Sequence, residues 1–318
     1  MKTKNNRGEK MHKEKVIVIC GPTASGKTAL SIELAKKING EIVSCDSMQI
    51  YEDMDIGTAK PTVEEMEGIK HYLIGTVSPT KRYSVAEYKK EAKAAIREII
   101  KKGKTPIVVG GTGLYVDSLI YEIEYPEIKF DEEYRKKLEI EVEEKGLDKL
   151  YEKAQKIDPI AIEKISRSDK KRILRILEIY HATGKTKTWH EKESRKKEIE
   201  YDYYVYGLLW EREELYQRIN KRCDIMIESG LIEEVKKLIK KYNEIPTAMQ
   251  ALGYKEVVEY LEKKLTKEEM IEKIKQETRR YAKRQMTWFR KNKQTIWLDA
   301  KESTQNNIKV ILEGVNGK

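Results

Sequence analysis

A glycine-rich segment near the start of the chain has the residue types of a phosphate-binding loop. It reads Gly21-Pro22-Thr23-Ala24-Ser25-Gly26-Lys27-Thr28, which matches GxxxxGK[ST] in full. Glycines let backbone N–H groups converge on phosphate oxygens, and the N-terminus of a following helix adds partial positive charge. The Lys27 ammonium supplies a full charge, and the Thr28 hydroxyl can ligate Mg²⁺. The segment therefore predicts a cradle for a phosphorylated ligand.

A lone carboxylate, Asp46, follows the next predicted strand and is expected beside this cradle. NTPases of this class usually hold Mg²⁺ through an acid at the end of an apolar strand. The best candidate strand here, 105–111, ends instead in glycines. A base next to a bound phosphate suits a reaction in which that phosphate leaves. From the residues alone, a turn or helix-start carboxylate is the commoner role of such an Asp, and this alternative stays open.

The net charge of +10 is unevenly distributed along the 318 residues. Four segments, 1–15, 164–175, 185–197 and 276–293, together carry +19, so the rest of the chain is acidic. Concentrated basic charge suits a polyanionic partner such as nucleic acid. Solvated lysine-rich surfaces would give the same count, so composition alone leaves both interpretations open.

The cysteine pattern favours a reducing compartment, and the hydropathy argues against a membrane protein. Cys20, Cys45 and Cys223 include no CxxC pair, which argues against a disulfide framework and a thiolate zinc site. No apolar run is long enough to span a membrane, and the charged N-terminus has no signal-peptide pattern. We expect a cytoplasmic protein with no membrane partner and a flexible basic tail over 1–13.

The elements that must position these residues alternate between strands and helices. Strands are predicted at 15–20, 41–45, 105–111, 201–210 and 295–299, and helices at 28–38, 84–103, from about 112, and at 211–228, 231–241, 250–263 and 267–291. This alternation predicts an α/β fold, a doubly wound parallel sheet of P-loop NTPase type. Ligands then bind at the carboxyl ends of the strands.

One stretch departs from the alternation. Between 123 and 198 the apolar periodicity is helical throughout and no strand is evident. The sequence therefore predicts an all-helical insertion domain over 123–198, within a P-loop core formed by 14–122 and 199–318.

Six separated blocks resemble the bacterial-type tRNA dimethylallyltransferases, also called tRNA isopentenyltransferases. The blocks are GPTASGKT (21–28), SCDSMQIYEDMDIGTAKPT (44–62), VVGGTGLYVDSL (108–119), RINKRCDIMIESGLIEEV (218–235), AMQALGYKE (248–256) and TRRYAKRQMTWFRK (278–291). The resemblance runs in order from about 16 to 300 and is looser over the insertion. Residues 70–75, KHYLIG, depart from the family pattern, so no role is carried onto them.

The resemblance implies a defined reaction. The family transfers a dimethylallyl group from dimethylallyl diphosphate to the exocyclic N6 amine of the adenine 3′-adjacent to the anticodon, with Mg²⁺ assisting and diphosphate leaving. It implies that Asp46 is the base and that Thr23 and Arg222 act on the diphosphate side. It also implies that the cradle residues 21–28 bind the diphosphate and that Thr28 faces the metal.

The resemblance also implies an interface for the anticodon stem-loop of tRNA. Separately from the resemblance, we expect a monomer. The matching positions are Asp46, Ser47, Met48, Gln49, Thr112, Arg135, Lys171, Arg172, Arg175, Lys283, Arg284, Trp288 and Arg290. Independently of the resemblance, Arg280, Arg284, Trp288 and Lys291 share one stripe at helical spacing. Basic side chains interleaved with an aromatic ring suit RNA, although Trp288 fits a core position equally well.

Three other functions remain alternatives at this point. A small-molecule or nucleotide kinase would use the same cradle with ATP as donor. A relative that prenylates AMP or ATP would lack the large insertion and the blocks at 248–256 and 278–291, which are present here. A non-catalytic, GTPase-like RNA-binding module would need a guanine-specificity motif, and none is evident.

Overall fold

The computed structural model describes residues 13–125, 131–194 and 198–317, so the predicted tail over 1–13 lies almost entirely outside it. The chain divides into two compact units, Met1–Ile120 with Glu200–Lys318 and, separately, Tyr121–Ile199. The sequence placed these boundaries at 122/123 and 198/199. Among the described residues, no helix combines the length and apolarity needed to cross a membrane.

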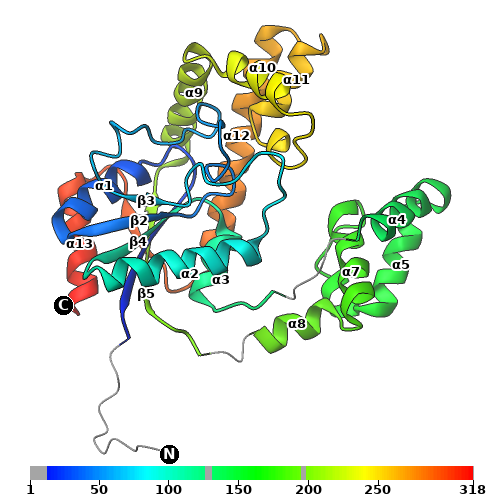
Figure 1. Ribbon diagram of the computed structural model, residues 1–318, viewed down its shortest axis with the longest axis horizontal. Coiled ribbons are helices and arrows are strands. Elements are labelled where there is room, and N and C mark those ends of the chain that lie inside the picture. Colours follow the sequence, from blue (N-terminus) through cyan, green and yellow to red (C-terminus); the bar gives the residue numbers. More distant parts are fainter. Residues whose placement is uncertain (1–12, 126–130, 195–197, 318) are drawn as a thin grey trace, which may run out of the picture. The chain divides into compact units, whose positions relative to one another are not determined.

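The first unit is built on a six-stranded sheet in the order β3-β2-β4-β1-β5-β6 (Figure 1). The strands are β1 (Lys15–Cys20), β2 (Gly40–Ser44), β3 (His71–Tyr72), β4 (Thr105–Gly110), β5 (Asp202–Leu209) and β6 (Ile296–Asp299). Every pairing is parallel, which confirms the predicted sheet type. All strands therefore end at the same edge, where β1 leads into the glycine-rich loop.

The central strand β1 is buried on both faces, as its continuous apolar sequence predicts. Because side chains alternate across a strand, Val16, Val18 and Cys20 pack on one face and Ile17 and Ile19 on the other. The first face is covered by α2 (Val85–Lys101) and α3 (Gly113–Ile120), and the second by α1 (Lys27–Ile38) and α13 (Thr304–Asn316). Helices on both faces give the doubly wound arrangement.

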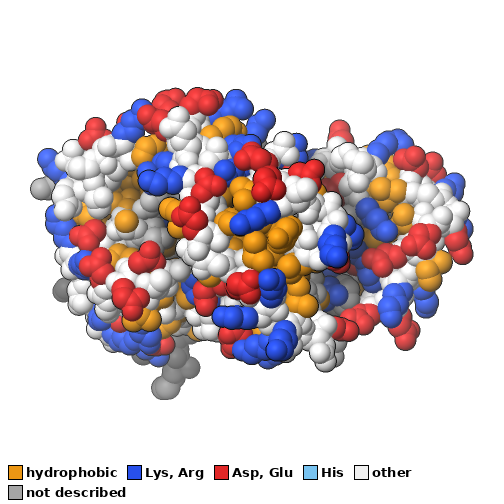
Figure 2. All heavy atoms as spheres, turned by 90° about the horizontal axis from the view of Figure 1, so that it is seen from above, with side chains coloured by type: hydrophobic (Ala, Val, Ile, Leu, Met, Phe, Trp, Pro, Cys, Tyr) orange, Lys and Arg blue, Asp and Glu red, His pale blue; other side chains and the backbone are white. Residues whose placement is uncertain are grey.

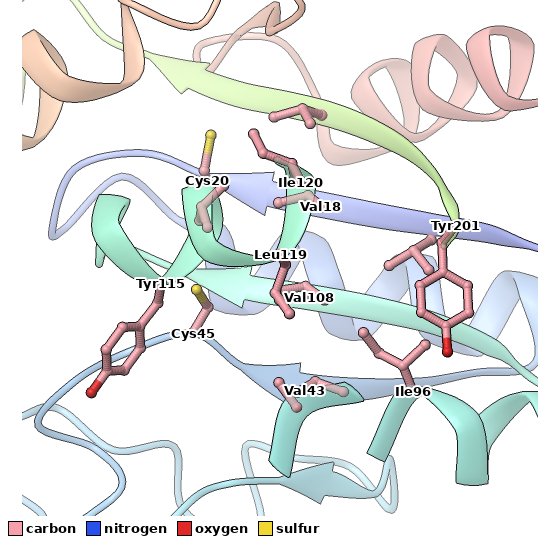
Figure 3. Packing of buried hydrophobic residues seen from close by; sticks show 14 of the residues in the cluster. Val18, Cys20, Val43, Cys45, Ile96, Val108, Tyr115, Leu119, Ile120 and Tyr201 are labelled. Carbon is pink, nitrogen blue, oxygen red and sulfur yellow. The ribbon is translucent and has the colours of Figure 1, made fainter. Parts of the chain in front are cut away.

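Two of the cysteines belong to this packing. Cys20 and Cys45 lie among Val18, Val43 and Val108 under α3 (Figure 3). Burial raises the pKa of the Cys20 thiol to about 12 and raises that of Cys45 as well. Both are small apolar core residues, as the sequence predicts, and neither is a nucleophile.

A group of helices follows β5 and packs on a second core. These are α9 (Arg212–Glu228), α10 (Leu231–Lys241), the 3₁₀ turn η1 (Ala248–Gln250), α11 (Tyr254–Leu261) and α12 (Lys267–Phe289). The capping box of Thr266 and Glu269 starts α12, just as Ser84 and Glu87 start α2. The core of this group also takes in Ile50, Tyr51 and Met54 from the segment after β2. The segment that carries Asp46 is therefore attached to both the sheet and these helices.

The second unit is helical throughout its described residues. It contains α4 (Glu132–Lys145), α5 (Leu147–Ile157), α6 (Pro159–Ile162), α7 (Lys170–Thr183) and α8 (Lys187–Ser194). Its core holds Leu138, Leu150, Ile173 and Leu177 among others. No strand occurs in the described residues between 131 and 194, which agrees with the helical periodicity of the apolar residues in the sequence.

Three elements differ from the sequence predictions. Helix α13 was not predicted, although Ser303 caps it by accepting a hydrogen bond from the Asn306 N–H. The two-residue strand β3 was missed because so short a strand has no period to recognise. The helix predicted over 250–263 is shorter because Gly253, with φ of 91°, interrupts it.

Candidate active site

The phosphate loop connects β1 to α1, which confirms the strand–loop–helix context. Gly21 and Gly26 have φ of 147° and 95°, in the region that favours glycine, and Ala24 also has a positive φ of 63°. These angles turn the backbone tightly around the position that a phosphate would occupy.

Two side chains, Trp210 just after β5 and Arg218 on α9, hold the outside of the loop. The indole Nε1 of Trp210 donates to the Ser25 carbonyl at 3.0 Å, and Arg218 Nε donates to the Ala24 carbonyl at 2.9 Å. The Arg218 guanidinium also lies 4.4 Å from the centre of the Trp210 ring. These two backbone carbonyls therefore accept hydrogen bonds from outside the cradle, and their partial negative charge is directed away from an anion bound in it.

The lysine of the motif, Lys27, folds back onto its own loop. Lys27 Nζ donates to the Pro22 carbonyl at 2.6 Å and to Ser25 Oγ at 3.4 Å. Burial, and then the positive charge of Arg222, lower the pKa of Lys27 to about 8, whereas the Asp46 carboxylate acts in the opposite direction. Burial also lowers the pKa of Arg222, again opposed by Asp46. The two cations and the acid therefore share one weakly screened region, and an anionic ligand would relieve the cation–cation repulsion.

Two cavities meet at the loop and share Ala24, Lys27, Thr28 and Arg222. The first has a volume of about 510 Å³ and lies beside the first turns of α1 and the middle of α9. Its wall includes Arg218, Lys221, Glu65 and Glu67. The second has a volume of about 380 Å³ and extends to the other side of the loop. A phosphate chain in the cradle would be reached from both.

The second cavity combines a polar end with an apolar wall. Its polar members include Thr23, Asp46, Ser47, Gln49, Tyr281, Arg284 and Gln285, and its apolar members include Met48, Ile219, Cys223, Met226, Leu252 and Ile274. Helices α9 and α12 each contribute residues three and four positions apart, so each lines the cavity with one face. A cavity of this kind can hold a small apolar group next to a carboxylate and a bound anion.

Asp46 has the turn-capping role that its sequence left open. Its Oδ1 accepts hydrogen bonds from the N–H groups of Met48 at 2.8 Å and Gln49 at 3.3 Å, which is the turn-capping role. Within the described part of the chain, its Oδ2 has no hydrogen-bond partner, and Asp46 lines the second cavity. The turn thus fixes the carboxylate while one oxygen remains for chemistry.

The carbonyl end of β4 closes tightly against this turn. A Cβ atom on Gly110 would lie 2.0 Å from the Cys45 carbonyl oxygen, so only glycine fits there. The next residue but one, Thr112, accepts a 3.0 Å hydrogen bond at Oγ1 from the Ser47 N–H. The predicted site residues Ser47 and Thr112 are thereby brought together.

Gln285 on α12 bridges two parts of the site, a position that the sequence did not predict for it. It is buried, with 5 % of its surface exposed, and its Nε2 donates to the Gly111 carbonyl at 2.9 Å. Its Oε1 accepts from the Thr23 N–H at 2.9 Å, so it joins the phosphate loop to the end of β4. The available signal was a polar residue at a core-facing position of a helix whose neighbouring core positions are Ala282 and Phe289.

The basic stripe predicted on α12 divides into residues with different environments. Trp288 packs against Gly113 and donates from Nε1 to Asp117 Oδ2 at 2.8 Å, so its environment is that of a core residue. Arg284 lines the second cavity, whereas Arg280 is exposed and ion-paired with Glu277. The other two candidate tRNA contacts at this end of the helix, Lys283 and Arg290, are exposed.

The candidate tRNA residues of the helical unit form a separate cluster. Arg135 on α4 is ion-paired with Glu139 at 2.9 Å and with Glu178 at 2.7 Å. Arg175 on α7 lies 3.4 Å from the same Glu178. Lys171 and Arg172, at the start of α7, are exposed. Lys and Arg are interspersed with Asp and Glu over the face seen in Figure 2, so that face has no single basic patch.

No cluster of three or more His, Cys, Asp or Glu side chains that could hold a metal ion occurs in residues 13–125, 131–194 and 198–317. The Thr28 hydroxyl lies in the wall of both cavities, and a carboxylate lines each of them, Glu65 the first and Asp46 the second, so each cavity offers hard oxygen donors. Mg²⁺ is commonly held in this way, by one or two protein oxygens together with substrate phosphates and water. These residues therefore fit Mg²⁺ that arrives with a phosphorylated ligand.

Comparison with known proteins gives a consistent result. A family model described as IPP transferase matches residues 49–292. A protein of Acetivibrio thermocellus named tRNA dimethylallyltransferase is 52% identical over 305 residues, which cover 94% of this chain and 97% of the relative. A protein of Carboxydothermus hydrogenoformans with the same name is 51% identical and covers 95% of this chain and 98% of its own.

Solved structures agree with these relatives. A tRNA isopentenylpyrophosphate transferase of Staphylococcus epidermidis superposes with a TM-score of 0.71 at 44% identity, covering 96% of this chain and 100% of that one. A eukaryotic dimethylallyltransferase acting on tRNA superposes with a TM-score of 0.79 at 34% identity, covering 96% of this chain and 80% of that one.

Proposed function

The chain belongs to the IPP transferase family, and from that premise we propose that it is a tRNA dimethylallyltransferase. It transfers the dimethylallyl group of dimethylallyl diphosphate to the exocyclic N6 amine of the adenine 3′-adjacent to the anticodon and releases diphosphate. One observation carries this proposal: Asp46, Lys27 and Arg222 line the same cavity, so a base and an anion cradle lie within one enclosed space.

The cradle is suited to the leaving group. As the bond between the allylic carbon and oxygen breaks, negative charge grows on the diphosphate, and the Lys27 and Arg222 cations lower the energy of that charge. Burial makes both interactions stronger than they would be in water. When Mg²⁺ is bound, it adds further positive charge at the diphosphate, and Thr28 is the residue that would hold it.

Asp46 serves the nucleophile. The exocyclic amine of adenine is weakly nucleophilic because its lone pair is delocalised into the ring. As the new bond from N6 to the allylic carbon forms, the amine proton passes to Asp46 Oδ2. The turn bonds at Oδ1 keep that oxygen oriented toward the cavity residues throughout.

The apolar wall of the second cavity suits the dimethylallyl group. Met48, Met226 and Leu252 are partly exposed and present aliphatic surface to it. They also exclude water, which would otherwise compete with the amine for the allylic carbon. A kinase has no need of such a wall beside its phosphate cradle.

The target adenine must leave the stacked anticodon loop to reach this cavity. We propose that residues 46–49, Thr112 and Arg284 surround it. The exposed cations Lys171, Arg172, Lys283 and Arg290, with Arg135 and Arg175, contact the phosphates of the tRNA stem-loop. We further propose that the enzyme acts in the cytoplasm as a monomer.

The deciding experiment compares two donors with one acceptor. Total tRNA is incubated with dimethylallyl diphosphate labelled in the allyl group, and separately with γ-labelled ATP. We expect label in tRNA from the first donor only. Transfer from ATP to tRNA or to a small molecule would favour the kinase alternative instead.

A further inference from the structure

A carboxylate on α10 collects an unusual set of hydrogen bonds from the segment after β2. Glu234 Oε2 accepts from the N–H groups of Asp55 at 2.9 Å and Ile56 at 2.7 Å. Its Oε1 accepts from the Gly57 N–H at 3.1 Å and from the Tyr254 hydroxyl at 2.6 Å. Three consecutive backbone donors and a phenol thus share one side chain.

The packing around this carboxylate is tight. Tyr254 is fully buried, and a Cβ atom on Gly57 would lie 2.4 Å from its ring, so the backbone lies directly on the aromatic face. Burial, followed by the nearby Glu234 charge, raises the pKa of Tyr254, which keeps the phenol protonated and able to donate. The turn at 55–57 is therefore fixed to α10 and α11 at one point.

The fixed turn leads directly to the residues beside the base. Gly57 and Thr58 line the second cavity together with Gln49. Gln49 Nε2 donates to the carbonyls of Thr58 at 3.2 Å and Ala59 at 3.1 Å. Because both of these partners can only accept, the amide orientation is settled and its Oε1 is the side-chain atom that can accept from a ligand. Gln49 also donates its backbone N–H to Asp46 Oδ1.

We infer that Glu234 is a positioning residue for prenyl transfer, which acts on Asp46 and Gln49 through the 55–59 backbone. Glu234 is in the lining of neither cavity. Its carboxylate fixes the turn, the turn fixes the two carbonyls that hold Gln49, and Gln49 fixes the acid. The expected effect on the rate of prenyl transfer rests on the proposed function. The expected fixing of the 55–57 turn by Glu234 does not.

The substitution Glu234→Gln isolates this role. An amide of the same shape has one accepting oxygen in place of two. Depending on its orientation, either the N–H groups of Asp55 and Ile56 lose their acceptor or the N–H of Gly57 does, and in the second case the Tyr254 hydroxyl can turn to accept from the new amide. The neighbouring Glu233 is exposed and ion-paired with Lys236, so Glu233→Gln is the matched control. Tyr254→Phe removes a single donor and keeps the ring under Gly57, which provides a milder variant if Glu234→Gln fails to fold.

Two readouts test the inference. Hydrogen exchange of the amides at 55–57 should accelerate in Glu234→Gln, and less in Tyr254→Phe, with β1 unchanged. The rate of a single turnover should fall by about tenfold to a hundredfold, the usual effect of misplacing a reacting group by a fraction of an ångström to an ångström. The KM for dimethylallyl diphosphate should change far less than the rate, because in the described part of the chain no hydrogen bond joins residues 55–59 to the phosphate loop. In an Asp46→Asn background the same substitution should add little, since its effect passes through Asp46.

Two results would overturn the inference. One is unchanged exchange at 55–57 in both variants. The other is faster exchange with a normal turnover rate per folded molecule, which would make the contact merely structural. Failure of the wild-type enzyme to transfer the prenyl group would reject the proposed function and leave the exchange result intact.

Discussion

The backbone N–H of Thr23 donates a 2.9 Å hydrogen bond to Oε1 of Gln285, a residue 262 positions later in the chain. The other end of the same amide donates to the Gly111 carbonyl. One buried side chain therefore sets the separation between the phosphate loop and the end of β4. We predict that Gln285→Leu lowers kcat/KM for dimethylallyl diphosphate roughly tenfold to a hundredfold, since it leaves buried backbone groups unpaired at about 1–3 kcal/mol each.

Steady-state kinetics with varied dimethylallyl diphosphate would measure this effect. Gln276→Leu, at an exposed position of the same helix, is the control and should behave as wild type. Wild-type kinetics in Gln285→Leu would show that the loop keeps its geometry without the bridge.

Replacement of the proposed base should separate binding from chemistry. Asp46→Ala and the isosteric Asp46→Asn should bind tRNA almost normally, because many other contacts hold the tRNA. Each should slow prenyl transfer by about 10²–10⁴-fold, the range for loss of a general base. Single-turnover rates and filter binding measure the two quantities, with Asp202→Asn on the exposed start of β5 as control. Near-normal turnover in both Asp46 variants would exclude the base role.

The lowered pKa of Lys27 predicts a pH-dependent affinity for the diphosphate. Below about pH 8 the ammonium is charged in the free enzyme. Above it, the neutral amine must take up a proton when the anion binds, so affinity should fall by up to about tenfold per pH unit. Calorimetric titration with a non-reactive thiolodiphosphate analogue between pH 7 and 9 measures this fall.

Lys27→Arg provides the control for that titration. Its guanidinium stays charged over the whole range, while the ligand's own ionisation is common to both proteins. The difference between the two pH curves therefore reports on Lys27 alone. Parallel curves would contradict the assignment of the titrating group.

Binding of tRNA should weaken steeply with salt if several cations contact phosphates. The logarithm of the binding constant should fall linearly with the logarithm of salt concentration, and Arg172→Gln should reduce the slope by about one. Lys309→Gln, on an exposed position of α13, is the charge-matched control and should leave the slope unchanged. A slope that is flat, or equal in both variants, would argue against the helical unit as a phosphate-binding surface.

The sequence predicted best what is local. The phosphate loop, the parallel strands around it and the position of Asp46 follow from short patterns with a known physical basis. The two roles of Asp46 could not be separated in this way, because they depend on which oxygen the turn uses. The blocks that resemble the family gave the reaction, which composition and periodicity left open.

What the sequence missed depends on contacts between distant residues. Gln285 and Glu234 look like ordinary helix residues until the fold brings Thr23 and the 55–57 turn to them. Trp288 fitted two roles, and its contacts with Gly113 and Asp117 show that it packs against the core. Periodicity identifies which face of a helix is buried, but not which buried polar residue meets a backbone group of the site.

The bridge through Gln285 continues toward the acceptor side of the site. Gly111 is followed by Thr112, whose hydroxyl oxygen accepts a hydrogen bond from the N–H of Ser47, the residue after Asp46. Whatever stiffens the phosphate loop therefore also stiffens the surroundings of the base. Two substrates that order the same set of contacts share the entropic cost of doing so, and each should raise the affinity for the other. Because such coupling is reciprocal, departure of either product should loosen the enzyme's hold on the other.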